Sequence, residues 1–139
     1  MCRLREENQI FTFNYIHICF YSTFFRGEIC CWGSAQRRNE GRSVILRARV
    51  GQKCDFRGIL KNSVYKLEAI VGLRSGGLPM AHQRKIFEDH IDLSVTMRDI
   101  LYSFFKSNQN APDDILHQTF VLGIQSWGKQ AIVIKCNKI

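Results

Sequence analysis

Two carboxylates on neighbouring predicted strands could take part in phosphodiester chemistry. Asp55 lies in the segment 53–60, which is rich in strand-forming residues, and Glu68 lies in the next such segment, 64–73. A turn centred on Lys61-Asn62 would join the two segments into an antiparallel hairpin. In that hairpin, cross-strand partners have numbers that sum to 123, so the sequence predicts that Asp55 faces Glu68.

Two carboxylates that face each other in an antiparallel pair have Cβ atoms about 4.5–5.5 Å apart and repel each other. Either a bound cation or the flanking basic side chains of the same face must compensate. These flanking residues are Lys53, Arg57 and Lys66.

A divalent cation held by Asp55 and Glu68 would suit a magnesium-dependent phosphodiesterase. Mg²⁺ takes oxygen ligands, polarises a phosphate and lowers the pKa of an attacking water, and Lys53 or Lys66 would stabilise the developing negative charge. The alternative is a solvated hairpin face on which charges of both signs neutralise one another. The sequence therefore predicts Asp55 and Glu68 as metal ligands and catalytic residues, with Lys53 and Lys66 as catalytic partners.

The positive charge of the chain is concentrated in one segment. Residues 37–66 hold nine basic and two acidic residues, a net charge of +7 out of +8 for the whole chain. Such a segment suits a polyanion, which is nucleic acid or an anionic membrane surface, although a solvated basic face is the alternative. The predicted nucleic-acid-binding residues are Arg37, Arg38, Arg42, Arg47, Arg49 and Arg57.

The six cysteines fit neither a disulfide scaffold nor a zinc site. The sequence has no C-x-x-C motif, its four histidines fall at no ligand spacing, and the adjacent Cys30 and Cys31 cannot chelate a metal as a zinc finger does. Cys54 lies in a strand pattern and is expected to be a buried, reduced thiol. The composition fits an intracellular protein, with the nucleus as a candidate location.

The order of predicted elements is that of an α/β domain. Helices are predicted at 28–40 and 80–106, and strands at 44–50, 53–60, 64–73, 119–126 and 130–136. In the long helix, apolar residues recur at spacings near four and are expected to face the sheet. They are Phe87, Ile91, Val95, Leu101 and Phe105, with Met97 and Phe104 widening the stripe. We expect a small mixed or antiparallel sheet with one long helix packed on it.

The first 27 residues differ from residues 28–139, which we expect to form a single domain that could be truncated at its C-terminal end. Residues 10–25 carry no formal charge and are rich in aromatic residues, but sixteen residues with polar interruptions are too few for a helical membrane span. Phe11, Phe13 and Tyr15 alternate with polar residues, which suits a strand. The N-terminal segment is therefore expected to be an appended strand or a poorly integrated tail, with a membrane anchor as the least favoured alternative.

The chain also resembles a known group of proteins. The run GQKCDFRG at 51–58, LEAIVG at 67–72, the long helix and VLGIQSWG at 121–128 resemble uncharacterised fungal proteins whose core is similar to the PD-(D/E)XK nuclease superfamily. That resemblance covers residues 28–128. It implies a restriction-endonuclease-like α-β-β-β-α-β core, with a metal held by an Asp on one strand and by D/E-x-K on the next.

Carried across by position, the resemblance matches Asp55 to the motif Asp and Glu68 to the acidic residue of D/E-x-K. Glu28 and Glu40 are candidates for a helix acid, whereas Ile70 stands where the superfamily has its lysine. The expected function is a nuclease-like nucleic-acid-binding domain with residual or lost magnesium-dependent cleavage. The alternative is a non-catalytic interaction module or the remnant of a larger protein.

Overall fold

The computed structural model describes residues 2–6, 22–62, 64, 67–76 and 82–138, and it contains six strands and three helices in these residues. The strands and helices follow in the order β1 (Cys2–Glu6), β2 (Ser22–Cys30), α2 (Trp32–Asn39), β3 (Lys53–Leu60), β4 (Glu68–Arg74), α3 (Gln83–Ser107), α4 (Asp113–Gln118), β5 (Phe120–Trp127) and β6 (Gln130–Lys138). The expected α/β class is confirmed.

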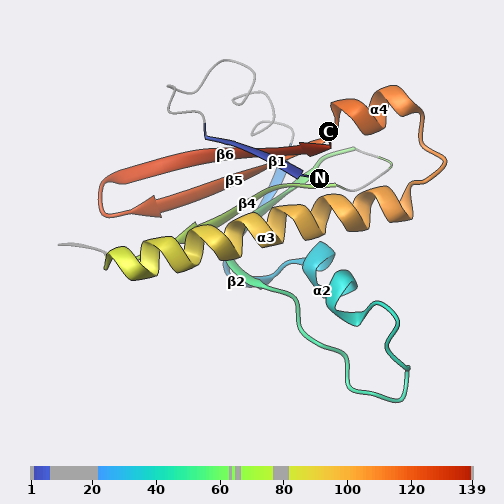
Figure 1. Cartoon of the computed structure of the whole chain (residues 1–139), viewed down its shortest axis with the longest axis horizontal. Coiled ribbons are helices and arrows are strands. Elements are labelled where there is room, and N and C mark those ends of the chain that lie inside the picture. Colours follow the sequence, from blue (N-terminus) through green and yellow to red (C-terminus); the bar gives the residue numbers. More distant parts are fainter. Residues whose placement is uncertain (1, 7–21, 63, 65–66, 77–81, 139) are drawn as a thin grey trace.

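All six strands belong to one mixed sheet with the order β1-β6-β5-β4-β3-β2. Neighbouring strands are antiparallel except β4 and β5, which are parallel. A parallel pair needs a crossover connection, and α3 forms part of it by crossing one face of the sheet between the two strands (Figure 1). The expected mixed sheet with a long helix packed on it is therefore observed.

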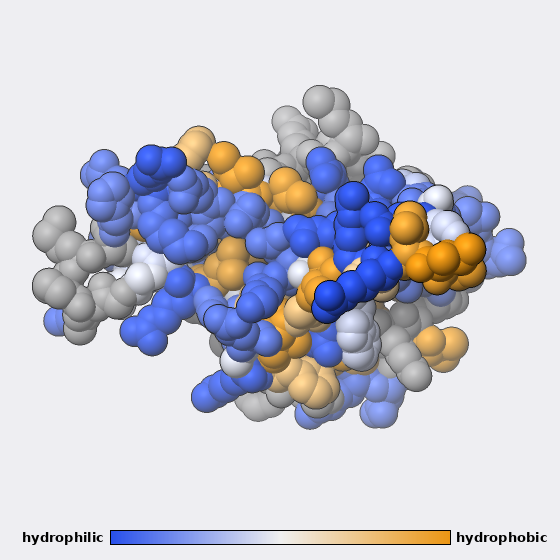
Figure 2. All heavy atoms as spheres, turned by 90° about the horizontal axis from the view of Figure 1, so that it is seen from below, coloured by the Kyte–Doolittle hydropathy of each residue, from blue (hydrophilic) through white to orange (hydrophobic). Residues whose placement is uncertain are grey.

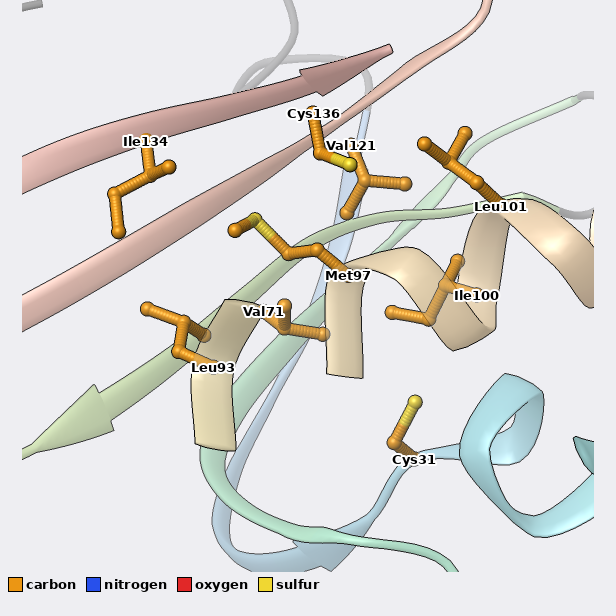
Figure 3. Packing of buried hydrophobic residues seen from close by; sticks show 9 residues of the cluster. All are labelled: Cys31, Val71, Leu93, Met97, Ile100, Leu101, Val121, Ile134 and Cys136. Atoms are coloured by element: carbon orange, nitrogen blue, oxygen red, sulfur yellow. The ribbon is translucent and has the colours of Figure 1, made fainter. Parts of the chain in front are cut away.

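The main core lies between α3 and the sheet. Figure 3 shows Leu93, Met97 and Ile100 of α3 beside apolar side chains of the sheet, among them Val71 of β4 and Val121 of β5. Leu93 and Met97 are fully buried. This contact holds α3 on the centre of the sheet, because β4 and β5 are its two middle strands.

The predicted apolar stripe of α3 is wrong in its N-terminal half. Phe87, Ile91 and Val95 are 65%, 46% and 39% exposed, whereas Leu93 and Met97 are buried in their place. Two rows of apolar residues at spacings near four run along α3, and only one of them faces the sheet. Asp89 is also buried on this helix, where it pairs with Lys85.

Two predicted elements between residues 28 and 50 differ from the structure, the helix in its bounds and the strand in its existence. Residues 28–30 end β2, where they pair with β3, so the helix predicted over 28–40 is confined to Trp32–Asn39. Residues 44–50 form turns and irregular backbone rather than a strand, and Val44 and Ile45 are 100% and 90% exposed. These apolar residues have the composition of a strand, but they pair with no described strand and their side chains are exposed.

The N-terminal part of the described chain supplies both edge strands of the sheet. β1 pairs with β6, and β2 pairs with β3. Strand β2 crosses the expected boundary between 27 and 28, while the predicted alternation at residues 11–15 lies outside the described residues. The hairpin predicted around Trp127-Gly128 is confirmed by β5 and β6. Among the described helices, none is both long enough and apolar enough to cross a membrane.

Among the described residues, cysteines occur both as free thiols and in a disulfide bond. Cys30, Cys31 and Cys54 are free, and the expectation of a buried thiol at Cys54 is confirmed. Burial raises the pKa of the Cys54 thiol to about 11, because the thiolate would be poorly solvated there. Cys136 is disulfide-bonded, which the sequence analysis did not expect.

Candidate functional site

The hairpin of β3 and β4 does not bring Asp55 and Glu68 together. Phe56 pairs with Gly72 and Glu68 pairs with Ile59, so the predicted sum of 123 is replaced by sums of 128 and 127, with a register shift between Gly58 and Ile59. Asp55 lies four residues from Ile59 along β3, which at a rise of about 3.3 Å per residue is roughly 13 Å. The predicted pairing of Asp55 with Glu68 is therefore wrong.

Asp55 is exposed and has a local partner. Its Oδ2 accepts a hydrogen bond from the backbone N–H of Arg74 at 2.5 Å. This contact joins the start of β3 to the end of β4. The Asp55 carboxylate therefore contacts the last residue of β4, at the opposite end of this strand from Glu68.

Glu68 is buried at the N-terminus of α2, with 4% of its surface exposed. Its Oε1 accepts a hydrogen bond from the backbone N–H of Trp32, and its Oε2 accepts one from the backbone N–H of Gly33, both at 2.9 Å. The first N–H groups of a helix have no partner within the helix, and the helix dipole favours a negative charge there. Since Cys31 at the N-cap makes no side-chain cap, Glu68 takes that role from another element.

Two further donors complete the surroundings of the Glu68 carboxylate. Nη1 of Arg57 donates to Oε1 at 3.0 Å in a buried ion pair, and Sγ of Cys31 donates to Oε2 at 3.3 Å. Each carboxylate oxygen therefore accepts two hydrogen bonds, which occupies the roughly four lone-pair sites of a carboxylate. Burial and then the charge of Glu68 raise the pKa of the Cys31 thiol well above its usual value.

Arg57 is a part of this buried cluster rather than of a solvated face. It is 6% exposed, and its Nη1 also donates to the carbonyl oxygen of Cys30 at 3.0 Å. Its guanidinium carbon lies 4.0 Å from the centroid of the Trp32 ring and 5.2 Å from that of Phe25, which are cation–π distances. We call Glu68, Arg57, Cys31, Trp32 and Gly33 the Glu68 cluster. Because Arg57 is enclosed in it, the prediction that Arg57 contacts nucleic acid is not supported by its position.

The remaining predicted catalytic groups are dispersed. Lys53 pairs with Glu28 at 2.7 Å, and both side chains are mostly exposed. Lys66 lies outside the described residues. Of the two candidate helix acids, Glu28 is on β2, and Glu40 follows the end of α2, where it pairs with Arg37 and Lys106.

The described residues do not fit the predicted magnesium site. No group of three or more His, Cys, Asp or Glu side chains that could hold a metal ion is found within the described part of the chain. Moreover, Glu68 has its lone pairs occupied by protein donors and Asp55 is too distant to share an ion with it. A metal at Glu68 would have to displace Arg57 or open the start of α2.

Exposed basic side chains that lack an ion-pair partner in the described part of the chain lie on a different surface. The segment 40–52 connects α2 to β3, and we call it the basic loop. No acidic residue occurs between Glu40 and Asp55, whereas this interval holds four basic residues, which are Arg42, Arg47, Arg49 and Lys53. Arg47 and Arg49 are exposed, and their guanidinium groups form no hydrogen bond or ion pair with other described residues.

Hydrogen bonds hold the base of the basic loop. Nη1 of Arg38 donates to the carbonyl oxygen of Val50 at 3.0 Å. The side-chain amide of Asn39 donates to the carbonyl oxygen of Arg49 and accepts from its backbone N–H, both at 2.7 Å. Arg38 is therefore occupied in supporting the loop, and Arg37 stacks on the ring of Tyr102 and pairs with Glu40.

The sequence analysis missed two features of this region. It assigned residues 44–50 to a strand, so it did not predict a projecting loop with apolar residues at its tip. It also did not foresee that Trp32 covers the guanidinium of Arg57. A signal for the first was present, because residues 41–52 carry three arginines and no acidic residue, which is typical of a solvated basic segment.

Comparisons with protein-family models, with curated proteins and with solved structures find no match to this chain.

Proposed function

We propose that this chain is a nucleic-acid-binding domain that contacts phosphates through the basic loop and has lost metal-dependent cleavage. The observation that carries the proposal is the pair of exposed arginines, Arg47 and Arg49, whose guanidinium groups are unpaired among the described residues and which lie in an interval, 41–54, that contains no acidic residue. Arginine presents a planar fork of donors that matches phosphate oxygens. Arg42 joins them, because only one of its nitrogens is engaged, on the carbonyl oxygen of Arg47.

The restriction-endonuclease-like fold remains part of this proposal. In its favour, β2, β3 and β4 are three successive antiparallel strands, followed by α3 and by β5 parallel to β4. The expected core has the same order of three strands, a helix and a last strand. It differs at the first helix, because α2 lies between β2 and β3 instead of preceding all three strands.

Loss of cleavage follows from the state of Glu68. An active site of the proposed kind needs two carboxylates that share a metal ion. Here one carboxylate caps α2 and neutralises the buried Arg57, and the lysine of the motif is replaced by Ile70, which is fully buried. In this proposal the domain binds nucleic acid and does not cleave it.

Salt dependence of binding tests the proposal. If Arg42, Arg47 and Arg49 each neutralise one phosphate of duplex DNA, the log-log slope is about −2.7, and affinity falls roughly 40-fold for a fourfold rise in salt. We expect Arg42→Gln, Arg47→Gln and Arg49→Gln together to remove most of this slope in fluorescence-anisotropy titrations with duplex DNA, single-stranded DNA and RNA.

The matched control removes three exposed basic residues elsewhere, by Arg26→Gln, Lys61→Gln and Lys129→Gln. This control has the same net charge as the loop variant, and we expect it to retain most of the slope. Equal losses in both variants would mean that only net charge matters, and the proposal would be wrong.

A protein-binding module is the second candidate, favoured by the exposed apolar residues Phe87, Ile91 and Val95 of α3. In that case the native chain would show no salt-dependent binding to any of the three nucleic acids. Substitution of Ile91 by Ser would then change its association with a protein partner and leave its stability almost unchanged.

A further inference from the structure

The tip of the basic loop exposes three consecutive aliphatic side chains. Val44 is 100% exposed, Ile45 is 90% exposed and Leu46 is 56% exposed. The backbone of these residues forms a hydrogen-bonded turn, in which the N–H of Leu46 donates to the carbonyl oxygen of Ser43 at 3.1 Å. The tip is therefore a small apolar projection of defined shape.

Arginines stand on both sides of this apolar tip. Arg42 precedes it, and Arg47 and Arg49 follow it. Nη2 of Arg42 donates to the carbonyl oxygen of Arg47 at 3.1 Å, which closes the loop below the tip. In Figure 1 the loop extends away from the sheet and from α3, and Figure 2, viewed from that side, shows hydrophobic side chains directly beside strongly hydrophilic ones.

Because tip and arginines are so close, a partner that covers both must present phosphates next to an apolar surface. Two kinds of partner have this property. In a duplex, stacked bases lie behind the phosphates, and in an anionic lipid layer, acyl chains lie beneath the headgroup phosphates. The surroundings of the loop favour the duplex. The exposed carboxylate of Asp92 lies at the base of the loop, where it accepts a hydrogen bond from the side chain of Gln52 at 3.3 Å, whereas Glu40 is already paired with Arg37 and Lys106. A flat anionic membrane would approach Asp92, whereas a narrow duplex can contact the tip and its arginines alone.

We propose that the tip acts as a wedge that enters the minor groove of duplex DNA and partly unstacks one base step, while Arg42, Arg47 and Arg49 bind the phosphates on either side. This inference rests on the proposed nucleic-acid binding and adds its mode. Aliphatic wedges of this kind kink DNA, and pyrimidine–purine steps such as TA unstack most readily. The domain should therefore favour duplexes that have a flexible step at their centre.

The experiment compares two duplexes of equal length, one with a central TA step and one with a stiff A-tract. The native chain should bind the TA duplex about tenfold more tightly and increase the fluorescence of 2-aminopurine placed at that step, as expected for unstacking. The variant Val44→Ser, Ile45→Ser, Leu46→Ser should bind both duplexes equally and leave the fluorescence unchanged.

Two control variants sharpen the test. Ile45→Met keeps an apolar side chain at the tip and should retain the preference, and Val64→Ser removes an aliphatic residue that is 90% exposed in another loop and should have no effect. Thermal melts should show that all variants fold, since the tip contributes nothing to the core.

The outcomes separate this inference from the function on which it rests. If neither duplex, nor single strands, nor RNA is bound, the proposed function itself is wrong. If duplexes are bound but the tip variant keeps the preference and the fluorescence change, only the wedge is wrong. If the tip substitutions abolish binding to phosphatidylserine-containing vesicles and leave DNA binding unchanged, the partner is a membrane surface and the wedge is overturned.

Discussion

Arginines have opposite environments in two neighbouring regions of this molecule. In the Glu68 cluster, Arg57 is 6% exposed, pairs with a buried carboxylate and lies between two aromatic rings. In the basic loop, which begins one residue beyond the end of α2, Arg47 and Arg49 are exposed, and their guanidinium groups have no hydrogen-bond or ion-pair partner among the described residues. Arg57, Arg47 and Arg49 all belong to the segment 37–66 that the sequence marks as basic.

The difference shows that the partners of a charge decide its role. A buried charge must be paired, since an unpaired one is strongly destabilising. Arg57 therefore stabilises the fold and is not available to an outside partner. An exposed charge is solvated at little cost and stays available for an outside partner. The two regions therefore make opposite predictions for stability and for binding.

The largest effect is expected from Arg57→Met. It leaves Glu68 as a buried charge without its cationic partner, which should lower the free energy of unfolding by about 3–5 kcal/mol in urea melts. The matched control is Arg84→Met, which breaks an exposed i,i+4 pair with Glu88 and should cost only about 0.3–0.5 kcal/mol.

A second variant separates lost packing from lost charge compensation. Adding Glu68→Leu to Arg57→Met removes the unpaired charge and should recover part of the stability, although the N-terminus of α2 loses its cap. If the double variant is as unstable as the sum of the single ones, the buried pair is not the reason for the effect of Arg57→Met.

A smaller effect is expected at the pair that defines the register of β3 and β4. A Cβ atom on Gly72 would lie 2.0 Å from Cζ of Phe56, so Gly72→Ala should force the ring to move and cost about 1–3 kcal/mol. In a Phe56→Ala background the same substitution should cost almost nothing. Additive losses in this double-mutant cycle would contradict the observed register and support one in which the two residues do not meet.

In the basic loop, substitutions should leave stability almost unchanged. Arg47→Gln with Arg49→Gln should alter the free energy of unfolding by less than about 0.5 kcal/mol, because both side chains are exposed and unpaired. Chemical denaturation of this variant beside Arg57→Met measures the contrast between the two regions directly. A loss comparable to that of Arg57→Met would show that the loop is part of the folded core.

The smallest effect concerns acid stability at the C-terminal end of α2. Hydrogen bonds from Lys106, Arg37 and Tyr102 lower the pKa of Glu40 to about 2 from its ordinary value of 4.5. A carboxyl group whose pKa is lowered by folding stabilises the fold above the unfolded value, and this contribution is lost as the pH falls from about 4.5 to about 2. Glu40→Gln should therefore reduce stability slightly at neutral pH and not at all near pH 2.

High salt provides the check on this last effect. The Glu40 pairs are exposed and should be screened, so the difference between the native chain and Glu40→Gln should shrink in concentrated salt at neutral pH. A difference that persists would indicate a packing role for Glu40.

Much of the fold could be predicted from the sequence because its elements carry local signals. The long helix and the final hairpin have clear periodicity and turn residues, and both are observed at nearly the predicted positions. The face of α3 could not be chosen in the same way. Both apolar rows of this helix have helical spacing, and only packing against the sheet decides that Leu93 is buried while Ile91 is exposed.

The hairpin shows why the candidate site could not be predicted in detail. The sequence predicts Glu68 as a metal ligand opposite Asp55, but in the structure its carboxylate pairs with Arg57 and caps α2. Gly33, whose N–H it accepts from, lies thirty-five residues away in the sequence. The register also depends on a connection longer than the expected tight turn and on a shift between Gly58 and Ile59. A change of a few residues in register moves every cross-strand pair, and neither feature has a local sequence signal.

The most direct test of the account is the stability of Glu68→Gln in the absence and presence of millimolar magnesium. The account predicts that this substitution lowers the free energy of unfolding by about 3 kcal/mol in both conditions, because it removes the charge that pairs with Arg57 and caps α2. Asp55→Asn should be nearly neutral in both. If magnesium instead stabilises the native chain and fails to stabilise either variant, Glu68 and Asp55 share a metal ion and the structural role assigned to Glu68 is wrong.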